Sequence, residues 1–232
     1  MFMKRIIKNA LAAATITAAL VASGQAALTV SVTDDAYVQS NLPDTNNGSA
    51  VSISSYFRNS IYYKTWMKLD ASSLATLTEG GTTLNLTASN ATSGYTIDFY
   101  LFSGVDSSSW NEGTITWNNA PGNNTGGAGF TTGASATYLA SFTSFSFTAG
   151  TTYPLTITGA AETALLGALN TGSRTATIAF QRTGSGTLAN NFHSTEATTE
   201  SFRPTLTAIP EPSQFALLGL GMVAIAFSRR RK

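Results

Sequence analysis

Cysteine is absent from this 232-residue chain, histidine occurs once, and charged residues make up only 11% of it. The lack of cysteine excludes disulfides, thiol nucleophiles and Cys-ligated metal sites, so packing alone must stabilise the fold. The single histidine, His193, is accompanied by neither a Gly-x-Ser-x-Gly nor a His-Glu-x-x-His motif. We therefore expect His193 to form hydrogen bonds rather than to act as a general base.

Basic residues are scarce in the middle of the chain. Seven of the 13 Lys and Arg residues lie outside residues 27–208, but only one of the 12 Asp and Glu residues does, which leaves six basic against eleven acidic residues inside. An acidic body of this kind lacks the cationic surface that nucleic-acid binding requires. Strong attraction to polyanionic glycans is disfavoured for the same reason.

Helical periodicity is also scarce. Only residues 160–169 predict a helix, with Ala161, Leu165 and Ala168 on one stripe. Elsewhere, short alternating segments between clusters of Gly, Asn, Ser and Thr predict strands. So many short strands indicate one all-β domain, a sandwich or a barrel. The expected strands are residues 28–33, 36–39, 51–54, 62–69, 83–88, 96–102, 137–142, 145–147, 153–158, 175–182, 191–194 and 205–208.

Residues 118–136, rich in Asn, Gly and Thr, form the longest stretch without periodicity. We expect a loop here. A long loop inside a compact domain is often functional, although it is also compatible with a solvated excursion.

The N-terminal residues have the order of a secretory signal peptide. Lys4, Arg5 and Lys8 precede an apolar segment at residues 10–22, and Gly24-Gln25-Ala26 has the small-x-small pattern of a cleavage site. We predict a signal peptide at residues 1–26. The alternative is an N-terminal helix packed on the domain, which the cationic start disfavours.

The C-terminal residues combine a polar motif, an apolar run and a basic end. Pro210-Glu211-Pro212 precedes the apolar residues 215–227, and Arg229, Arg230, Arg231 and Lys232 follow. A hydrophobic core helix is excluded because consecutive cations do not enter a core. The run is also shorter than the roughly twenty residues that span a bilayer, so a permanent transmembrane anchor is second to a sorting tag.

This tail resembles the PEP-CTERM signal of Gram-negative bacteria that make extracellular polymer. The resemblance implies that an exosortase-type enzyme recognises and cuts residues 209–232, which contact the membrane before processing. We expect export through the inner membrane to the cell surface or the extracellular matrix. Whether the segment is cleaved or retained stays open.

The body contains local patterns in the order of the bacterial DNRLRE domain, also classed as a carbohydrate-binding module of the alginate-binding type. The patterns are Asp35-Ala36-Tyr37-Val38, Asn46-Asn47-Gly48, residues 63–70, residues 110–121, Phe192-His193-Ser194-Thr195-Glu196 and Arg203-Pro204-Thr205-Leu206. Leu69 stands where an aromatic residue is usual, and residues 155–158 depart from the expected Asp-Val-Thr element. The resemblance implies a jelly-roll-like β-sandwich over residues 27–208, an accessory module without catalysis of its own.

Period-two alternation divides the expected strand at residues 62–69 into two faces. The face with Met67 and Leu69 should meet the core. The other face alternates aromatic and cationic residues: Tyr62, Lys64, Trp66 and Lys68. If exposed, it is a candidate platform for a sugar that bears a carboxylate. The alternative is an outer face covered by the N-terminal segment, with the Lys stems lying along the ring.

Trp110, Glu112 and Trp117 form a second candidate binding site. Residues 114–117 alternate into an expected strand, which would bring the two indoles close together at a sheet edge. Exposed indoles would stack on pyranose faces while Glu112 binds hydroxyl groups. The alternative, that both rings belong to the core, is favoured because Trp is highly buried on average.

Oxygen-bearing side chains indicate one candidate cofactor, a structural calcium ion. Its ligands would come from Asp34, Asp35, Asp44, Asn46 and Glu196, where the first and last strands meet. Their spacing matches no calcium-loop motif, and a short Asp and Asn cluster is also typical of a simple turn.

Two functional hypotheses of different classes follow. In the first, the body is a non-catalytic carbohydrate-binding module that holds the protein or the cell in an extracellular polysaccharide. In the second, it is a structural matrix protein without a dedicated ligand. A polysaccharide lyase or hydrolase ranks third, because the sequence picks out no pair of carboxylates at the spacing that a glycosidase needs.

Overall fold

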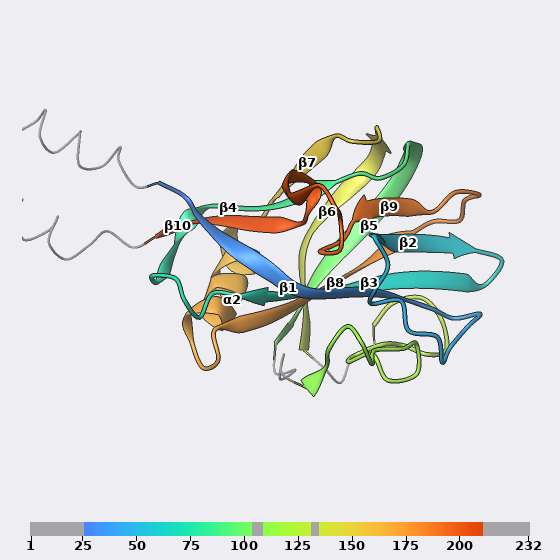
Figure 1. Ribbon diagram of the computed structural model, residues 1–232, viewed down its shortest axis with the longest axis horizontal. Helices are drawn as coiled ribbons and strands as arrows, with labels where there is room; N and C mark the ends of the chain where they lie inside the picture. The colour runs from blue at the N-terminus through green and yellow to red at the C-terminus, as the bar shows by residue number, and fades with distance from the viewer. Residues whose placement is uncertain (1–25, 104–108, 131–134, 211–232) are drawn as a thin grey trace, which may run out of the picture.

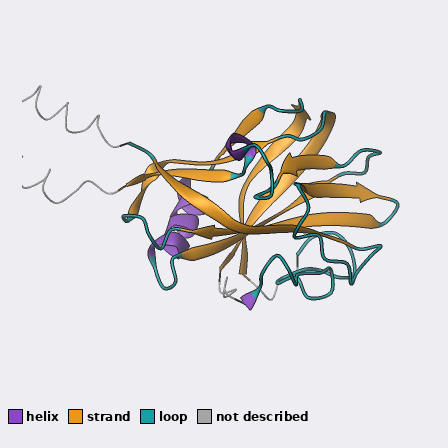
Figure 2. Cartoon of the chain, in the orientation of Figure 1, coloured by secondary structure: helices purple, strands orange, loops and turns teal. Residues whose placement is uncertain are grey.

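The computed structural model describes residues 26–103, 109–130 and 135–210 (Figure 1). The predicted signal peptide and nearly all of the predicted sorting segment lie outside these ranges. Within them the chain forms the expected all-β sandwich with one α-helix (Figure 2). The elements are β1 (Leu28–Gln39), β2 (Ser52–Arg58), β3 (Ile61–Asp70), β4 (Leu77–Thr87), β5 (Thr92–Ser103), β6 (Ser135–Phe147), β7 (Thr152–Thr156), α2 (Gly159–Asn170), β8 (Thr175–Thr183), β9 (Asn190–His193), the 3₁₀ helix η2 (Glu200–Phe202) and β10 (Thr205–Pro210).

The strands are antiparallel to their neighbours in the order β6-β5-β8-β3-β1-β10-β4-β7, and β2 pairs with both β3 and β9. β1 connects the two halves of the sheet, β6-β5-β8-β3 on one side and β10-β4-β7 on the other. Residues 28–31 of β1 pair with β10, and residues 31–39 pair with β3. The sheet therefore folds back on itself, and side chains from both halves fill one core.

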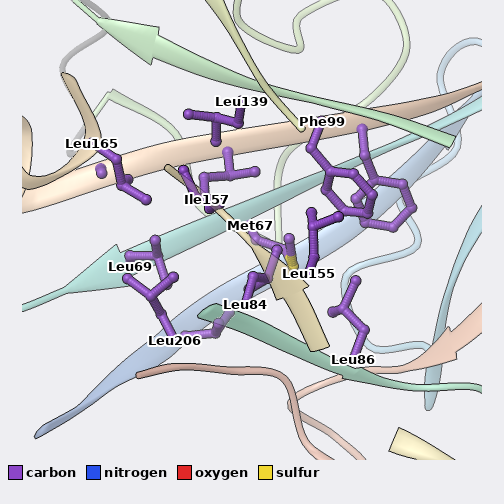
Figure 3. Packing of buried hydrophobic residues seen from close by; sticks show 14 of the residues in the cluster. Met67, Leu69, Leu84, Leu86, Phe99, Leu139, Leu155, Ile157, Leu165 and Leu206 are labelled. Atoms are coloured by element: carbon purple, nitrogen blue, oxygen red, sulfur yellow. The ribbon is translucent and has the colours of Figure 1, made fainter. Parts of the chain in front are cut away.

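The main core lies between the two halves of the sheet (Figure 3). Met67 and Leu69 of β3 point into it, as the alternation on this strand predicts. Opposing side chains come from the other half of the sheet and from α2, among them Leu84, Leu86, Leu155, Leu165 and Leu206. Full burial of one such side chain contributes about 1.5–3 kcal/mol. Packing of this extent is what a fold without disulfides requires.

Most of the expected elements are present. The helix predicted at residues 160–169 is α2. Residues 28–33 and 36–39 were expected to be separate strands, but they form one strand, because an irregularity between Val32 and Asp34 shifts the register without ending the pairing. In the same way, residues 137–142 and 145–147 belong to the single strand β6. No helix in the described ranges combines the length and the apolarity needed to cross a membrane.

A second, smaller core lies on the opposite face of β3 and β8. It is closed by residues 109–130, here called the covering coil, which runs beneath these strands in Figure 2. Trp110, Ile115 and Trp117 of the covering coil pack against Trp66 of β3 and Ala179 of β8. At this place the molecule therefore has a third layer that is almost free of regular secondary structure.

Candidate functional site

The face of β3 that carries Tyr62, Lys64, Trp66 and Lys68 is an interior face. Trp66 is 0% exposed and Lys64 is 1% exposed, while Tyr62 and Lys68 are half-buried. The covering layer is the covering coil and not the N-terminal segment, which forms β1 in the same sheet. The expectation of an exposed platform is therefore corrected, although alternation assigned these residues to the right face. A sugar contact through the partly exposed Tyr62 or Lys68 stays a prediction.

Lys64 is held by the covering coil at its ammonium group. Four oxygen atoms lie 2.6 to 3.1 Å from Nζ: Oδ1 of Asn123 and the backbone carbonyls of residues 124, 127 and 129. Nζ also lies 4.5 Å from the centroid of the Trp117 ring. Burial lowers the pKa of Lys64 to about 7, whereas the oxygens and the ring favour its charged form. The ammonium of Lys64 therefore holds this part of the covering coil together by binding several of its oxygen atoms.

Trp66 and Lys68 also direct their polar groups into the covering coil. The indole Nε1 of Trp66 donates to the carbonyl oxygen of Pro121 at 3.0 Å. Lys68 Nζ donates to the carbonyl oxygen of Trp110 at 2.7 Å and lies 3.2 Å from Asp34 Oδ2. Lys64 is buried and therefore not free to attract a carboxylated sugar, and the partly exposed Lys68 is already paired with Asp34.

Trp110 and Trp117 are buried by the same layer, in agreement with the core alternative. Trp110 Nε1 donates to Thr177 Oγ1 at 3.0 Å, and Trp117 Nε1 donates to the carbonyl oxygen of Thr125 at 3.2 Å. Neither ring has an open face on which a pyranose could stack.

Residues 114–117 do not form the expected strand: Thr114 and Trp117 belong to turns, and the two residues between them have no regular structure. Asn119 explains the difference, because its side chain accepts from the backbone N–H of Thr116 at 2.6 Å and donates to the carbonyl oxygen of Thr114 at 2.9 Å. These bonds occupy backbone groups that a neighbouring strand would need. The alternation at this place reflects packing onto the sheet and not strand pairing.

The side chain of Glu112 extends from the covering coil to β1 and reaches the strand edge that does not pair with β3. The backbone N–H of Asp35 donates to Glu112 Oε2 at 3.2 Å, and the backbone N–H of Glu112 donates to Asp34 Oδ1 at 3.4 Å. From another segment, the backbone N–H of Thr195 donates to Asp35 Oδ2 at 2.8 Å, and Thr195 Oγ1 donates to Glu196 Oε1 at 2.8 Å. The structure thus gathers Asp34, Asp35, Glu112 and Glu196, which we call the acidic cluster.

The other two predicted calcium ligands are placed differently. Asp44 is exposed and accepts a hydrogen bond from Asn118 Nδ2 at 2.8 Å. Asn46 directs its amide N–H groups to the carbonyl oxygens of Glu112 and Ile115, the latter at 2.7 Å. Asn46 therefore fixes the backbone next to the acidic cluster, and Asp44 lies outside it.

An exposed aromatic pair lies on β5 and β6, where the sequence analysis proposed no site. Tyr100 and Tyr138 are opposite each other in the ladder, with ring centroids 5.8 Å apart. Tyr138 is 50% exposed, and Tyr100 is half-buried. Tyr100 also lies 5.3 Å from Phe130, whose ring is 5.6 Å from Trp66. An aromatic row thus runs from the buried face of β3 to the outermost strand, β6.

Polar side chains accompany this aromatic pair. In the strand register Asp98 lies opposite Ser141 of β6 and Gln181 of β8. Partial burial raises the pKa of Asp98, and it also raises the pKa of Tyr100, to which the neighbouring Asp98 charge adds. Gln181 Oε1 accepts from the backbone N–H of Gly129 at 2.8 Å, which ties the covering coil to the border of this surface. We call this surface the tyrosine strip; it comprises Asp98, Tyr100, Tyr138 and Ser141, and the buried Gln181 lies at its border.

His193 is half-buried, and its ring centroid lies 4.9 Å from that of Phe202. This contact gives the imidazole a packing role. The assignment of His193 as a hydrogen-bonding residue and not a base stays a prediction.

The described body is thus a β-sandwich with an exposed tyrosine pair beside hydrogen-bonding side chains. The chain belongs to carbohydrate-binding module family 96, which matches residues 26–208. The PEP-CTERM protein-sorting motif matches residues 208–232. A search of curated proteins finds no match. Both resemblances inferred from the sequence are confirmed, and the sorting motif implies export and surface sorting by an exosortase-type enzyme in a Gram-negative bacterium.

Proposed function

We propose that this protein is a surface-sorted module that binds an extracellular polysaccharide without cleaving it, and that the tyrosine strip is the contact surface. The observation that carries the proposal is the exposure of Tyr138 beside Tyr100, on the sheet face opposite the main core. Sugar rings have apolar faces that stack on aromatic side chains. Asp98 and Ser141 supply groups that can exchange hydrogen bonds with sugar hydroxyls.

The charges on this surface favour a neutral glycan. Asp98 places a carboxylate in the tyrosine strip, and the described body as a whole is acidic. The lysines that would favour an acidic sugar, Lys64 and Lys68, are bound to the covering coil instead. A sugar carboxylate would therefore meet a like charge, which is unfavourable.

The direct test is affinity electrophoresis of the purified protein in gels that contain neutral or acidic polysaccharides. We expect a neutral polymer to retard the protein, and Tyr138→Ala to weaken that binding about fivefold, since an aromatic contact of this kind contributes on the order of 1 kcal/mol. Leu188→Ala is the matched control, because Leu188 is another exposed apolar side chain that lies outside the strip.

The same gels distinguish the competing functions. Unchanged mobility in every polymer would favour a structural matrix protein without a dedicated ligand. Release of reducing or unsaturated ends would favour a lyase or hydrolase. Substitution of Trp66 cannot decide between these outcomes, because removal of a fully buried Trp costs about 3–5 kcal/mol of stability and disturbs the whole face.

A further inference from the structure

The acidic cluster joins three segments that are far apart in the sequence. Asp34 and Asp35 come from β1, Glu112 from the covering coil, and Glu196 from the residues between β9 and η2. Lys68 offsets the charge of Asp34 at 3.2 Å. The remaining carboxylates belong to Asp35, Glu112 and Glu196, and they repel one another in a partly buried place.

Two carboxylate oxygens of this cluster are buried without a hydrogen-bond partner. Asp35 is 1% exposed, and while its Oδ2 accepts from Thr195, its Oδ1 accepts from no group in the described residues. Glu196 Oε2 is in the same situation. Buried acceptors of this kind are costly and call for an ion or a water molecule.

We propose that a calcium ion binds at the acidic cluster, with Asp35, Glu112 and Glu196 as carboxylate ligands, and that it clamps the covering coil to β1. Only oxygen ligands are present in this set, which suits a hard cation. Calcium accepts six to eight oxygens in flexible geometry, whereas magnesium demands a compact octahedron. No three His, Asp or Glu side chains of the described ranges enclose a metal position as they stand, so the proposal requires Asp35, Glu112 and Glu196 to move closer together when the ion binds.

The backbone around Glu112 is already fixed for this role. Asn46 donates to the carbonyl oxygens of Glu112 and Ile115. Gly48 packs so closely on Glu112 that a Cβ at this position would overlap its carbonyl group. The turn at residues 46–48 therefore holds the backbone of the covering coil at Glu112. Such preorganisation lowers the cost of binding.

The test uses the purified protein in chelator and then in calcium or magnesium up to about 5 mM, since extracellular modules bind calcium at about 0.1–1 mM. We expect calcium to raise the midpoint of thermal unfolding by several degrees and magnesium to raise it less. Terbium offers a second readout, because Trp110 lies two residues from Glu112 and can sensitise its luminescence.

Asp35→Asn and Glu196→Gln separate ligation from simple packing. Each removes a charge but keeps a similar shape, so in chelator both variants should unfold at or above the wild-type temperature, while the calcium shift and the terbium signal disappear. Asp44→Asn is the matched control and should keep both responses, because Asp44 is exposed outside the cluster. A wild-type midpoint that does not respond to calcium, or a calcium shift that persists in both cluster variants, would overturn the proposal.

Discussion

Lys64 shows how a single residue can organise a layer that has almost no regular secondary structure. Its ammonium is surrounded by four oxygens of residues 123–129, three of which are backbone carbonyls. A buried lysine is rare unless its charge is compensated. Here the compensation comes from oriented dipoles and a ring, and no carboxylate is needed.

This arrangement predicts the effect of Lys64→Met. The substitution keeps the apolar stem but leaves the four oxygens without their donor, which should lower the free energy of unfolding by about 3 kcal/mol. Chemical denaturation measures that loss, and hydrogen exchange should show reduced protection in the covering coil. Arg58→Met is the control, because Arg58 is an exposed cation of β2. Wild-type stability in Lys64→Met would show that the ammonium does not hold the coil.

At the scale of elements, sequence periodicity predicted the strands and the faces of β3 but not what covers them. Met67 and Lys64 lie on the faces that alternation assigned to them. The covering coil alternates only at residues 114–117, and this short pattern predicted a strand rather than a layer that returns to β3. Period-two alternation could also have predicted part of the tyrosine strip, because Ile97 and Phe99 on one face of β5 place Asp98 and Tyr100 on the other. The acidic cluster was predicted only in part, since Glu112 joins it through tertiary contacts.

Helix α2 is connected to β4 through a buried carboxylate. Glu162 Oε1 accepts hydrogen bonds from the backbone N–H groups of Gly80, Gly81 and Thr82 at 3.0 to 3.2 Å. Burial by itself would raise the pKa of Glu162, but these hydrogen bonds outweigh it and lower the pKa below its ordinary value of 4.5. The ionised side chain thus fixes the irregular middle of β4 against the helix.

The direction of this pKa shift gives a pH dependence. A carboxylate with a lowered pKa in the folded state contributes stability above its unfolded pKa, about 4.5, and loses that contribution as the pH falls through the folded pKa. Glu162→Gln should therefore destabilise the protein by about 1–3 kcal/mol at pH 7 and progressively less below pH 4.5. Urea unfolding between pH 7 and pH 3 measures the difference. A difference in unfolding free energy between wild type and Glu162→Gln that stays constant over this pH range would contradict the role of the charge. Glu200→Gln is the control, because Glu200 is exposed.

At the scale of the whole molecule, the two ends of the described sandwich lie next to each other. Leu28 and Ala208 pair with each other, so the first and last strands leave the domain side by side, as Figure 1 shows. The tyrosine strip lies on β5 and β6, and β6 is the outermost strand of its half of the sheet. A surface protein held through residues after β10 would thus keep its proposed contact surface away from the attachment point.

The central claim is that polysaccharide contacts the tyrosine strip while the tryptophan face of β3 is structural. The most direct measurement is an NMR titration of the protein with an oligosaccharide of a polymer that retards it. The three tryptophans supply three indole N–H signals, which report on the buried face. We predict that the signals of Asp98, Tyr100 and Tyr138 shift while the indole signals do not. Shifts of the Trp66 and Trp117 indoles, with Tyr100 and Tyr138 unchanged, would contradict this account.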